Sequence, residues 1–156
     1  MQTPEYPSEK ITRIIKSGTP LLYVATWEEE RLERMLSKTS EALFGDSREI
    51  WQWSAALGFT SGPGQDKGIL DPVEALAFII QADSDAIFLM KDLPALFETK
   101  PALVRALRDI YDTFSTRAGS VVLSHPSIDI PAGLSKEGPL RRLGGPRACH
   151  DKRARE

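Results

Sequence analysis

Three consecutive glutamates, Glu28, Glu29 and Glu30, are the side chains of this sequence best placed to do chemistry. Carboxylates can act as a general base or as ligands of a metal ion. They also have a structural explanation, because the helix dipole stabilises each acid in a first helical turn by about 0.3–1 kcal/mol. Thr26 and Glu29 have the spacing of a capping box, which predicts that a helix starts at Thr26. We favour the structural explanation and keep the base or metal ligand as the alternative.

Asp92 is a further carboxylate that could do chemistry, because it ends the apolar run from Ile87 to Met90. In phosphate-handling folds an acid at the end of such a strand holds Mg²⁺. An acid at this position can equally turn the chain before the following Leu93-Pro94. Considered alone, Asp92 is better explained by the turn.

Ser124 and His125 end another apolar run, directly before Pro126. A histidine there could sense or polarise a ligand, although it is more often only a polar residue at a strand end. The two side chains do not form a nucleophile–base pair, because neighbours in a strand point to opposite faces. The sequence shows no set of nucleophile, base and orienting group, and no metal site.

The glycine-rich stretch from Gly58 to Gly68 invites comparison with a phosphate-binding loop. A P-loop needs a glycine, four residues, and then Gly-Lys-Ser or Gly-Lys-Thr at the start of a helix. Here Lys67 lies between Asp66 and Gly68, and no helix is predicted to start directly after it. The stretch is therefore predicted to be a flexible surface loop.

The elements that hold these residues alternate between strand and helix patterns. Asp71-Pro72-Val73-Glu74 has an N-cap, a proline in the first turn and an acid at the third position, which together predict a helix start. Trp51 and Trp53 would share one face of a strand and pack in the core. Strands are predicted at about 21–25, 49–54, 86–90 and 120–124, and helices at about 8–17, 26–44, 72–81 and 101–115.

This alternation predicts an α/β fold with a three-layer parallel sheet of four or five strands. The carboxyl ends of parallel strands meet at one edge, where ligands usually bind. We therefore expect Thr26, Ser54, Asp92 and Ser124 near one edge.

Composition narrows the class of protein. A chain of 156 residues with 41% hydrophobic and 27% charged residues is typical of one soluble globular domain. A net charge of −2 favours no class of partner, and a single cysteine excludes an internal disulfide framework. The sequence has no apolar run near the roughly 20 residues of a membrane span and no secretory signal, so we expect a cytoplasmic protein without membrane contact.

The two ends differ from the middle. Residues 1–7 contain two prolines and are expected to form a flexible arm, and residues 8–137 form the domain. Residues 138–156 carry six basic side chains against Asp151 and Glu156, and are expected to be disordered. A basic tail can bind nucleic acid, but without aromatic residues or a folded platform a solvated tail is favoured.

The order of motifs resembles the core of the AAA-type P-loop ATPases. The segment 87–92 is similar to the Walker B strand of that core, and 121–124 to its sensor strand. A closer resemblance, over roughly residues 8–137, is to the amino-terminal domain of a cyanobacterial, plastid and bacterial AAA ATPase family. The motifs that carry it are Thr26-Trp27-Glu28-Glu29-Glu30-Arg31, Trp53-Ser54, Gly58, Asp71-Pro72-Val73-Glu74-Ala75-Leu76, Lys91-Asp92 and Leu107-Arg108-Asp109.

The resemblance implies a degenerate AAA/RecA-like core without a Walker A motif. It makes Asp92 Walker-B-like and Ser124 and His125 sensor-like. An acidic turn, which includes Thr26, Glu28, Glu29 and Arg31, then replaces the phosphate loop. The full-length family is expected to be an ATPase that uses ATP and Mg²⁺. This chain looks like an isolated or truncated amino-terminal domain, for which we predict no catalytic residue, no cofactor and no activity alone.

The favoured function is a non-hydrolysing regulatory or assembly domain that contacts the ATPase domain of the same family or other AAA subunits. One alternative is a domain that binds ATP and Mg²⁺ through Asp92, and a second is nucleic-acid binding by the basic tail. The absence of a Walker A lysine counts against the first alternative. The net charge of −2 counts against the second.

Overall fold

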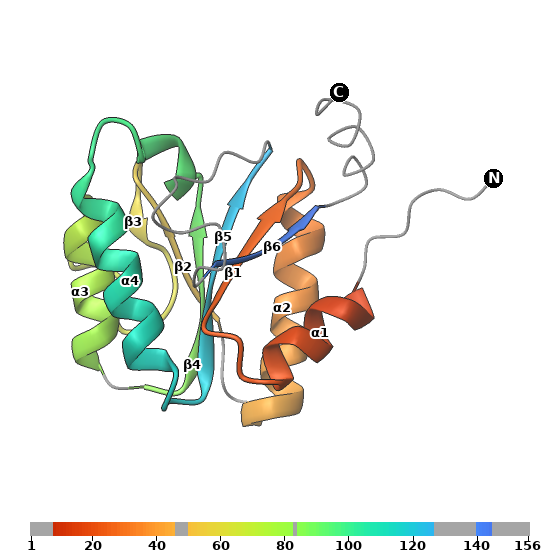
Figure 1. Cartoon of the computed structure of the whole chain (residues 1–156). Coiled ribbons are helices and arrows are strands. Elements are labelled where there is room, and N and C mark those ends of the chain that lie inside the picture. The colour runs from red at the N-terminus through yellow and green to blue at the C-terminus, as the bar shows by residue number, and fades with distance from the viewer. Residues whose placement is uncertain (1–7, 46–49, 83, 127–139, 145–156) are drawn as a thin grey trace.

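In the described part of the chain, six strands form a sheet in the order β3-β2-β4-β5-β1-β6 (Figure 1). The computed structural model describes residues 8–45, 50–82, 84–126 and 140–144. The strands are β1 (Leu21–Ala25), β2 (Trp51–Ser54), β3 (Gly58–Phe59), β4 (Ala86–Lys91), β5 (Gly119–His125) and β6 (Leu140–Gly144). The helices are α1 (Ser8–Lys16), α2 (Glu29–Phe44), α3 (Pro72–Ala82) and α4 (Ala102–Phe114), with a short 3₁₀ helix, η1 (Leu93–Leu96).

The sheet is mostly parallel. Among the described strands, β1, β2, β4, β5 and β6 run in one direction, and β3 pairs antiparallel with β2, with Trp53 opposite Phe59. The predicted three-layer α/β fold is confirmed, because α1 and α2 cover one face of the sheet and α3 and α4 the other (Figure 1). The almost continuous burial of β1, β4 and β5 is what a sheet covered on both faces requires.

The first part of the glycine-rich stretch is not the flexible loop that its composition predicted, whereas residues 65–68 are exposed. It starts with β3, and Ser61 Oγ donates a hydrogen bond to Ile50 O at 2.8 Å and accepts one from Gln52 N at 3.1 Å. A Cβ at Gly62 would lie 2.7 Å from the ring of Trp51, so only glycine allows this close approach. Gly62 therefore lets the backbone pack against Trp51 in the core.

The two tryptophans of β2 lie in the core between the sheet and the α3/α4 layer, as predicted. Trp51 packs edge-on against Phe88, with ring centroids 4.7 Å apart. Trp53 is fully buried, and its indole Nε1 donates a hydrogen bond to Ile69 O at 2.9 Å. Both rings hold β2 against the helices and are unavailable to a ligand.

The basic segment expected to be disordered contains a strand. β6 pairs parallel with β1, from Leu21 opposite Leu140 to Ala25 opposite Gly144. The expectation of disorder is wrong for these five residues, and the fold extends beyond residue 137. An edge strand is held by backbone hydrogen bonds to its neighbour, so it needs no continuous apolar run. The expected arm, 1–7, and the rest of the expected tail lie outside the described residues.

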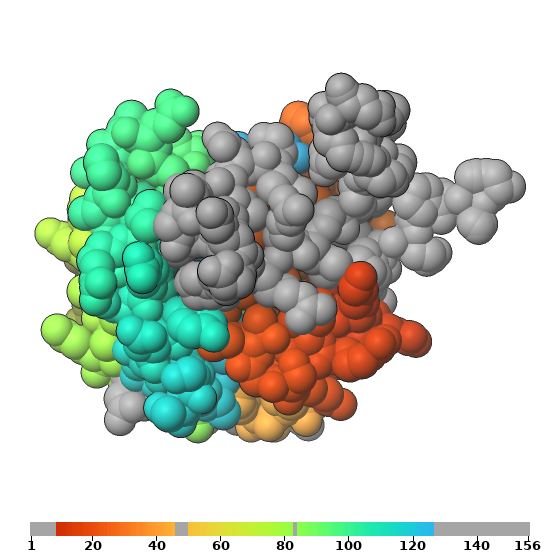
Figure 2. All heavy atoms as spheres, viewed as in Figure 1, coloured from red at the N-terminus to blue at the C-terminus, as the bar shows by residue number. Residues whose placement is uncertain are grey.

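Helices form much of the described surface. Figure 2 shows the side of the molecule on which α4, in green, and α1, in red, face the viewer. None of the helices in the described ranges is long and apolar enough for a membrane crossing.

Candidate functional site

The carboxyl ends of β1, β4 and β5 bring together residues that are far apart in the sequence. Ala25 is opposite His125, and Lys91 is opposite Ser124. Past the strand ends, Thr26 N donates to His125 O at 3.0 Å and Asp92 N donates to Ser124 O at 2.7 Å. The structure thus places Thr26, Asp92, Ser124 and His125 at one edge of the sheet, and Ser54 ends β2 at the same edge.

The side chains of Asp92 and His125 lie within hydrogen-bond distance of each other at this edge. Asp92 Oδ1 lies 3.2 Å from His125 Nδ1, and the side chains are 58% and 23% exposed, respectively. Asp92 has a φ of 58°, in the left-handed region that aspartate tolerates better than most residues, and it turns the chain from β4 into η1. Such an exposed pair contributes little to stability, about 0–1 kcal/mol. Its geometry supports the interpretation of Asp92 as a turn residue.

Two hydroxyl groups at the edge are almost fully buried. Thr26 Oγ1 accepts a hydrogen bond from Glu28 N at 3.0 Å. Ser124 Oγ has no hydrogen-bond partner in the part of the chain that the structure describes. A buried hydroxyl left unpaired costs about 1–3 kcal/mol. Ser124 is therefore a polar group at the edge that packing alone does not explain.

The acidic turn, residues 26–31, joins β1 to α2 and differs from the predicted capping box. α2 starts at Glu29, with Glu28 at the N-cap position and no side-chain cap. Thr26 lies outside the helix, because its N–H donates to His125 O and its hydroxyl accepts from the N–H of the N-cap residue Glu28 and not from a helical N–H. The helix start predicted at Thr26 is therefore wrong, whereas its end at Phe44 is confirmed.

Apart from the buried Thr26, the side chains of the acidic turn are exposed or partly exposed. Glu28 Oε1 lies 3.1 Å from Arg31 Nη1, and both side chains are about half exposed. The indole of Trp27 is 69% exposed. A shallow hollow of about 510 Å³ is lined by Trp27, Glu28, Glu29, Glu30, Arg31 and Arg34.

Sequence reasoning did not single out Trp27. The available signal was an aromatic residue in an otherwise polar turn, directly after a buried strand. An exposed aromatic ring beside carboxylates can contact an apolar or cationic group of a partner. Within the described ranges, no three His, Cys, Asp or Glu side chains come close enough to hold a metal ion.

Comparison with known proteins assigns the family. The family model described as "SpoVK-like AAA ATPase, N-terminal domain" matches residues 7–142. The uncharacterized AAA domain-containing protein ycf46 of Pyropia yezoensis is 26% identical over 132 residues, which are 82% of this chain and 26% of the relative. The ycf46 protein of Guillardia theta is 27% identical over 126 residues, 78% of this chain and 24% of the relative.

The chain thus spans about a quarter of the length of these curated relatives. The matched residues include the acidic turn and all of the elements from α1 to β5. The expected resemblance to an amino-terminal domain of AAA ATPases is confirmed, and the chain belongs to the SpoVK-like AAA ATPase N-terminal domain family.

Proposed function

We propose that this chain is a non-hydrolysing regulatory or assembly domain of an AAA-family ATPase and acts through protein contacts. The observation that carries the proposal is the acidic turn at the carboxyl edge of the sheet. Phosphates would bind at this edge in a nucleotide-binding α/β protein. Carboxylates occupy that position here.

The acidic turn is a poor receptor for phosphate. Only three residues separate β1 from α2, without a glycine or a lysine among them. The N–H groups of Glu28 and Glu29 already donate to Thr26 Oγ1 and Trp27 O, at 3.0 and 3.2 Å. Three glutamate carboxylates would also repel the phosphates, which offsets the favourable dipole of α2.

The residues at the edge do not fit a magnesium–nucleotide complex. Mg²⁺ is usually bound through one or two carboxylates together with phosphate oxygens. Asp92 offers one carboxylate, which contacts His125, and the acidic turn offers no cradle for the phosphates that would share the ion. We therefore propose ATP and Mg²⁺ as ligands of the longer proteins of this family and not of these residues.

Exposed apolar side chains support a role in protein contacts. Trp27 and Leu57 are 69% and 70% exposed, and both lie in turns that follow the carboxyl ends of parallel strands. Large apolar side chains exposed at an edge are typical of interaction surfaces. The proposed partners are the ATPase domain of this family or other AAA subunits.

Titration calorimetry of the purified chain with Mg-ATP tests the proposal. The expected result is no saturable binding tighter than millimolar, because the phosphate cradle is missing. The Asp92→Ala variant serves as the matched control. Saturable micromolar binding that this variant loses would overturn the proposal in favour of a nucleotide-binding domain.

A further inference from the structure

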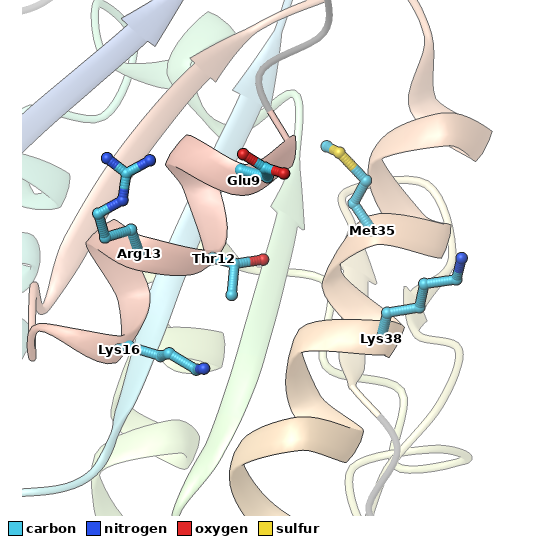
Figure 3. A pocket seen from close by; sticks show the side chains of 6 residues that line it. All are labelled: Glu9, Thr12, Arg13, Lys16, Met35 and Lys38. Atoms are coloured by element: carbon cyan, nitrogen blue, oxygen red, sulfur yellow. The ribbon is translucent and has the colours of Figure 1, made fainter.

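A groove on the outer surface separates α1 from α2 (Figure 3). Its volume is about 510 Å³. A hydrogen bond of 2.8 Å between Thr12 Oγ1 and Thr39 Oγ1 connects the two helices beside it, and Thr39 also donates to Met35 O at 3.0 Å. The lining residues are Glu9, Thr12, Arg13, Lys16, Met35 and Lys38.

The groove is basic, with an apolar side chain in its wall. Its lining includes three cations, Arg13, Lys16 and Lys38, and one carboxylate, Glu9. No ion pair within the described residues involves any of these three cations. Met35 is half-buried, and its flexible thioether adapts to irregular apolar partners. Such a groove suits an apolar side chain that is accompanied by carboxylates.

The acidic turn of the same chain has those properties. Trp27 is exposed, and neither Glu29 nor Glu30 forms an ion pair with another described residue. Glu28 is paired with Arg31, and Arg34 also lines the turn. The three glutamates and two arginines of the turn therefore have a net charge of −1, and the side chains that line the groove have a net charge of +2. The two surfaces are therefore complementary in the sign of their charge, and each carries an apolar anchor.

We propose that the acidic turn of one copy docks into the α1–α2 groove of a second copy. Trp27 packs against Met35, while Glu29 and Glu30 face Arg13, Lys16 and Lys38. This inference rests on the proposed function, because it names the partner for a domain that acts through protein contacts.

The contact is heterologous, because the two surfaces are different parts of the molecule. Met35 lies six residues after Glu29, or about 9 Å along the axis of α2. In a pair, one copy therefore keeps a free groove and the other keeps a free acidic turn, so association would continue into filaments or close into a ring. A buried tryptophan contributes about 150–250 Å², far below the roughly 1,200–2,000 Å² of a stable complex, so the self-association is weak and sensitive to salt.

Two variants remove the two surfaces separately. Trp27→Ser removes the anchor of the acidic turn, and the double variant Arg13→Glu, Lys38→Glu reverses the charge of the groove. The substituted side chains are exposed, so both proteins should fold, which circular dichroism checks. Arg105→Glu, Arg108→Glu on α4 is the control for net charge, because it changes the charge by the same amount in the other helical layer, where it also breaks the exposed ion pair between Arg105 and Asp109.

Sedimentation equilibrium at low salt measures the outcome. We expect the wild-type chain and the α4 control to self-associate with increasing concentration, and each of the other variants to associate at least tenfold more weakly. An equimolar mixture of these two variants should form a one-to-one complex and nothing larger. Only the intact turn of the groove variant and the intact groove of the Trp27→Ser variant can pair.

A monomeric wild-type chain at all concentrations, or a mixture that stays monomeric, would overturn the inference. Association that is unchanged in both variants would also overturn it, because the contact would then lie elsewhere. None of these three results affects the Mg-ATP titration, so this inference can fail while the proposed function stands.

Discussion

The N-termini of α2 and α3 carry similar sequence signatures and are built differently. At α3, Asp71 Oδ2 accepts a hydrogen bond from Glu74 N at 3.0 Å, and Asp71 Oδ1 lies 3.1 Å from Lys100 Nζ. At α2, Thr26 has the same spacing from Glu29, but the helix starts only at Glu29 and no side chain caps it. A cap signature alone therefore does not fix a helix start.

The difference comes from the residues that precede each helix. Thr26 directly follows β1, and its N–H still donates to His125 O, so the backbone continues along the sheet. Asp71 follows a loop and is free to adopt the cap conformation. As a result, the N-terminus of α3 is closed by its own carboxylate, whereas that of α2 presents glutamates at the edge where ligands usually bind.

The largest expected effect is at α3. Asp71→Ala removes the cap of Glu74 N and the ion pair with Lys100, and should lower the free energy of unfolding by about 1–2 kcal/mol. Urea denaturation measures the loss. Asp71→Asn, which keeps a capping oxygen, should lose less, and an equal loss in both variants would show that the cap contributes nothing.

A smaller effect is expected at the acidic turn. Thr26→Val keeps the shape of the side chain and removes the hydroxyl that accepts from Glu28 N. The free energy of unfolding should fall by about 0.5–1.5 kcal/mol, the net contribution of one hydrogen bond. Ser124→Ala, which removes a buried hydroxyl without a described partner, is the control and should be neutral or stabilising. If Ser124→Ala lowered the free energy of unfolding as much as Thr26→Val, the assignment of a stabilising hydrogen bond to Thr26 alone would be contradicted.

Low pH should weaken the Asp71 cap at the N-terminus of α3 but not the Thr26 hydrogen bond before α2. The hydrogen bond from Glu74 N, with a contribution from Lys100, lowers the pKa of Asp71 below its ordinary value of 3.8. Its stabilisation is fully present above pH 3.8 and is lost as the pH falls through the lower pKa of the folded state. Unfolding from pH 5 to pH 2 should therefore show the stability gap between wild type and Asp71→Asn shrinking, while the Thr26→Val gap stays constant. A stability difference between wild type and Asp71→Asn that stays constant with pH would contradict a stabilising cap by the Asp71 carboxylate.

The smallest effect concerns the glutamates. Glu30→Gln removes one charge from the first turn of α2 and should cost a few tenths of a kcal/mol, because this carboxylate is exposed. Thermal unfolding at low and high salt measures it, and the difference should fade at high salt. A loss above 1 kcal/mol would show that Glu30 has a structural role.

Much of the fold follows from local patterns. The buried strands β1, β4 and β5 and the apolar stripes of α3 and α4 are predicted close to their ends, because periodic burial dominates these segments. Two strands are not predicted. β3 has two residues, and β6 depends on pairing with β1 rather than on its own pattern.

The candidate site is predictable only in part. Parallel topology brings Asp92, Ser124 and Thr26 to one edge, as expected from their positions at strand ends. The pairing of Asp92 with His125 and the loss of the Thr26 cap depend on neighbouring strands 33 and 99 residues away in sequence. The local sequence contains no signal for such contacts.

We propose above that the N-terminus of α2 does not bind a nucleotide. Amide NMR during titration with Mg-ATP tests it residue by residue, with Asp71–Glu74 as the closed control terminus. We expect no saturable shift of the amides of residues 26–31 or of Asp92 below millimolar concentration. Saturable shifts of the Glu30 and Arg31 amides at micromolar concentration would contradict it.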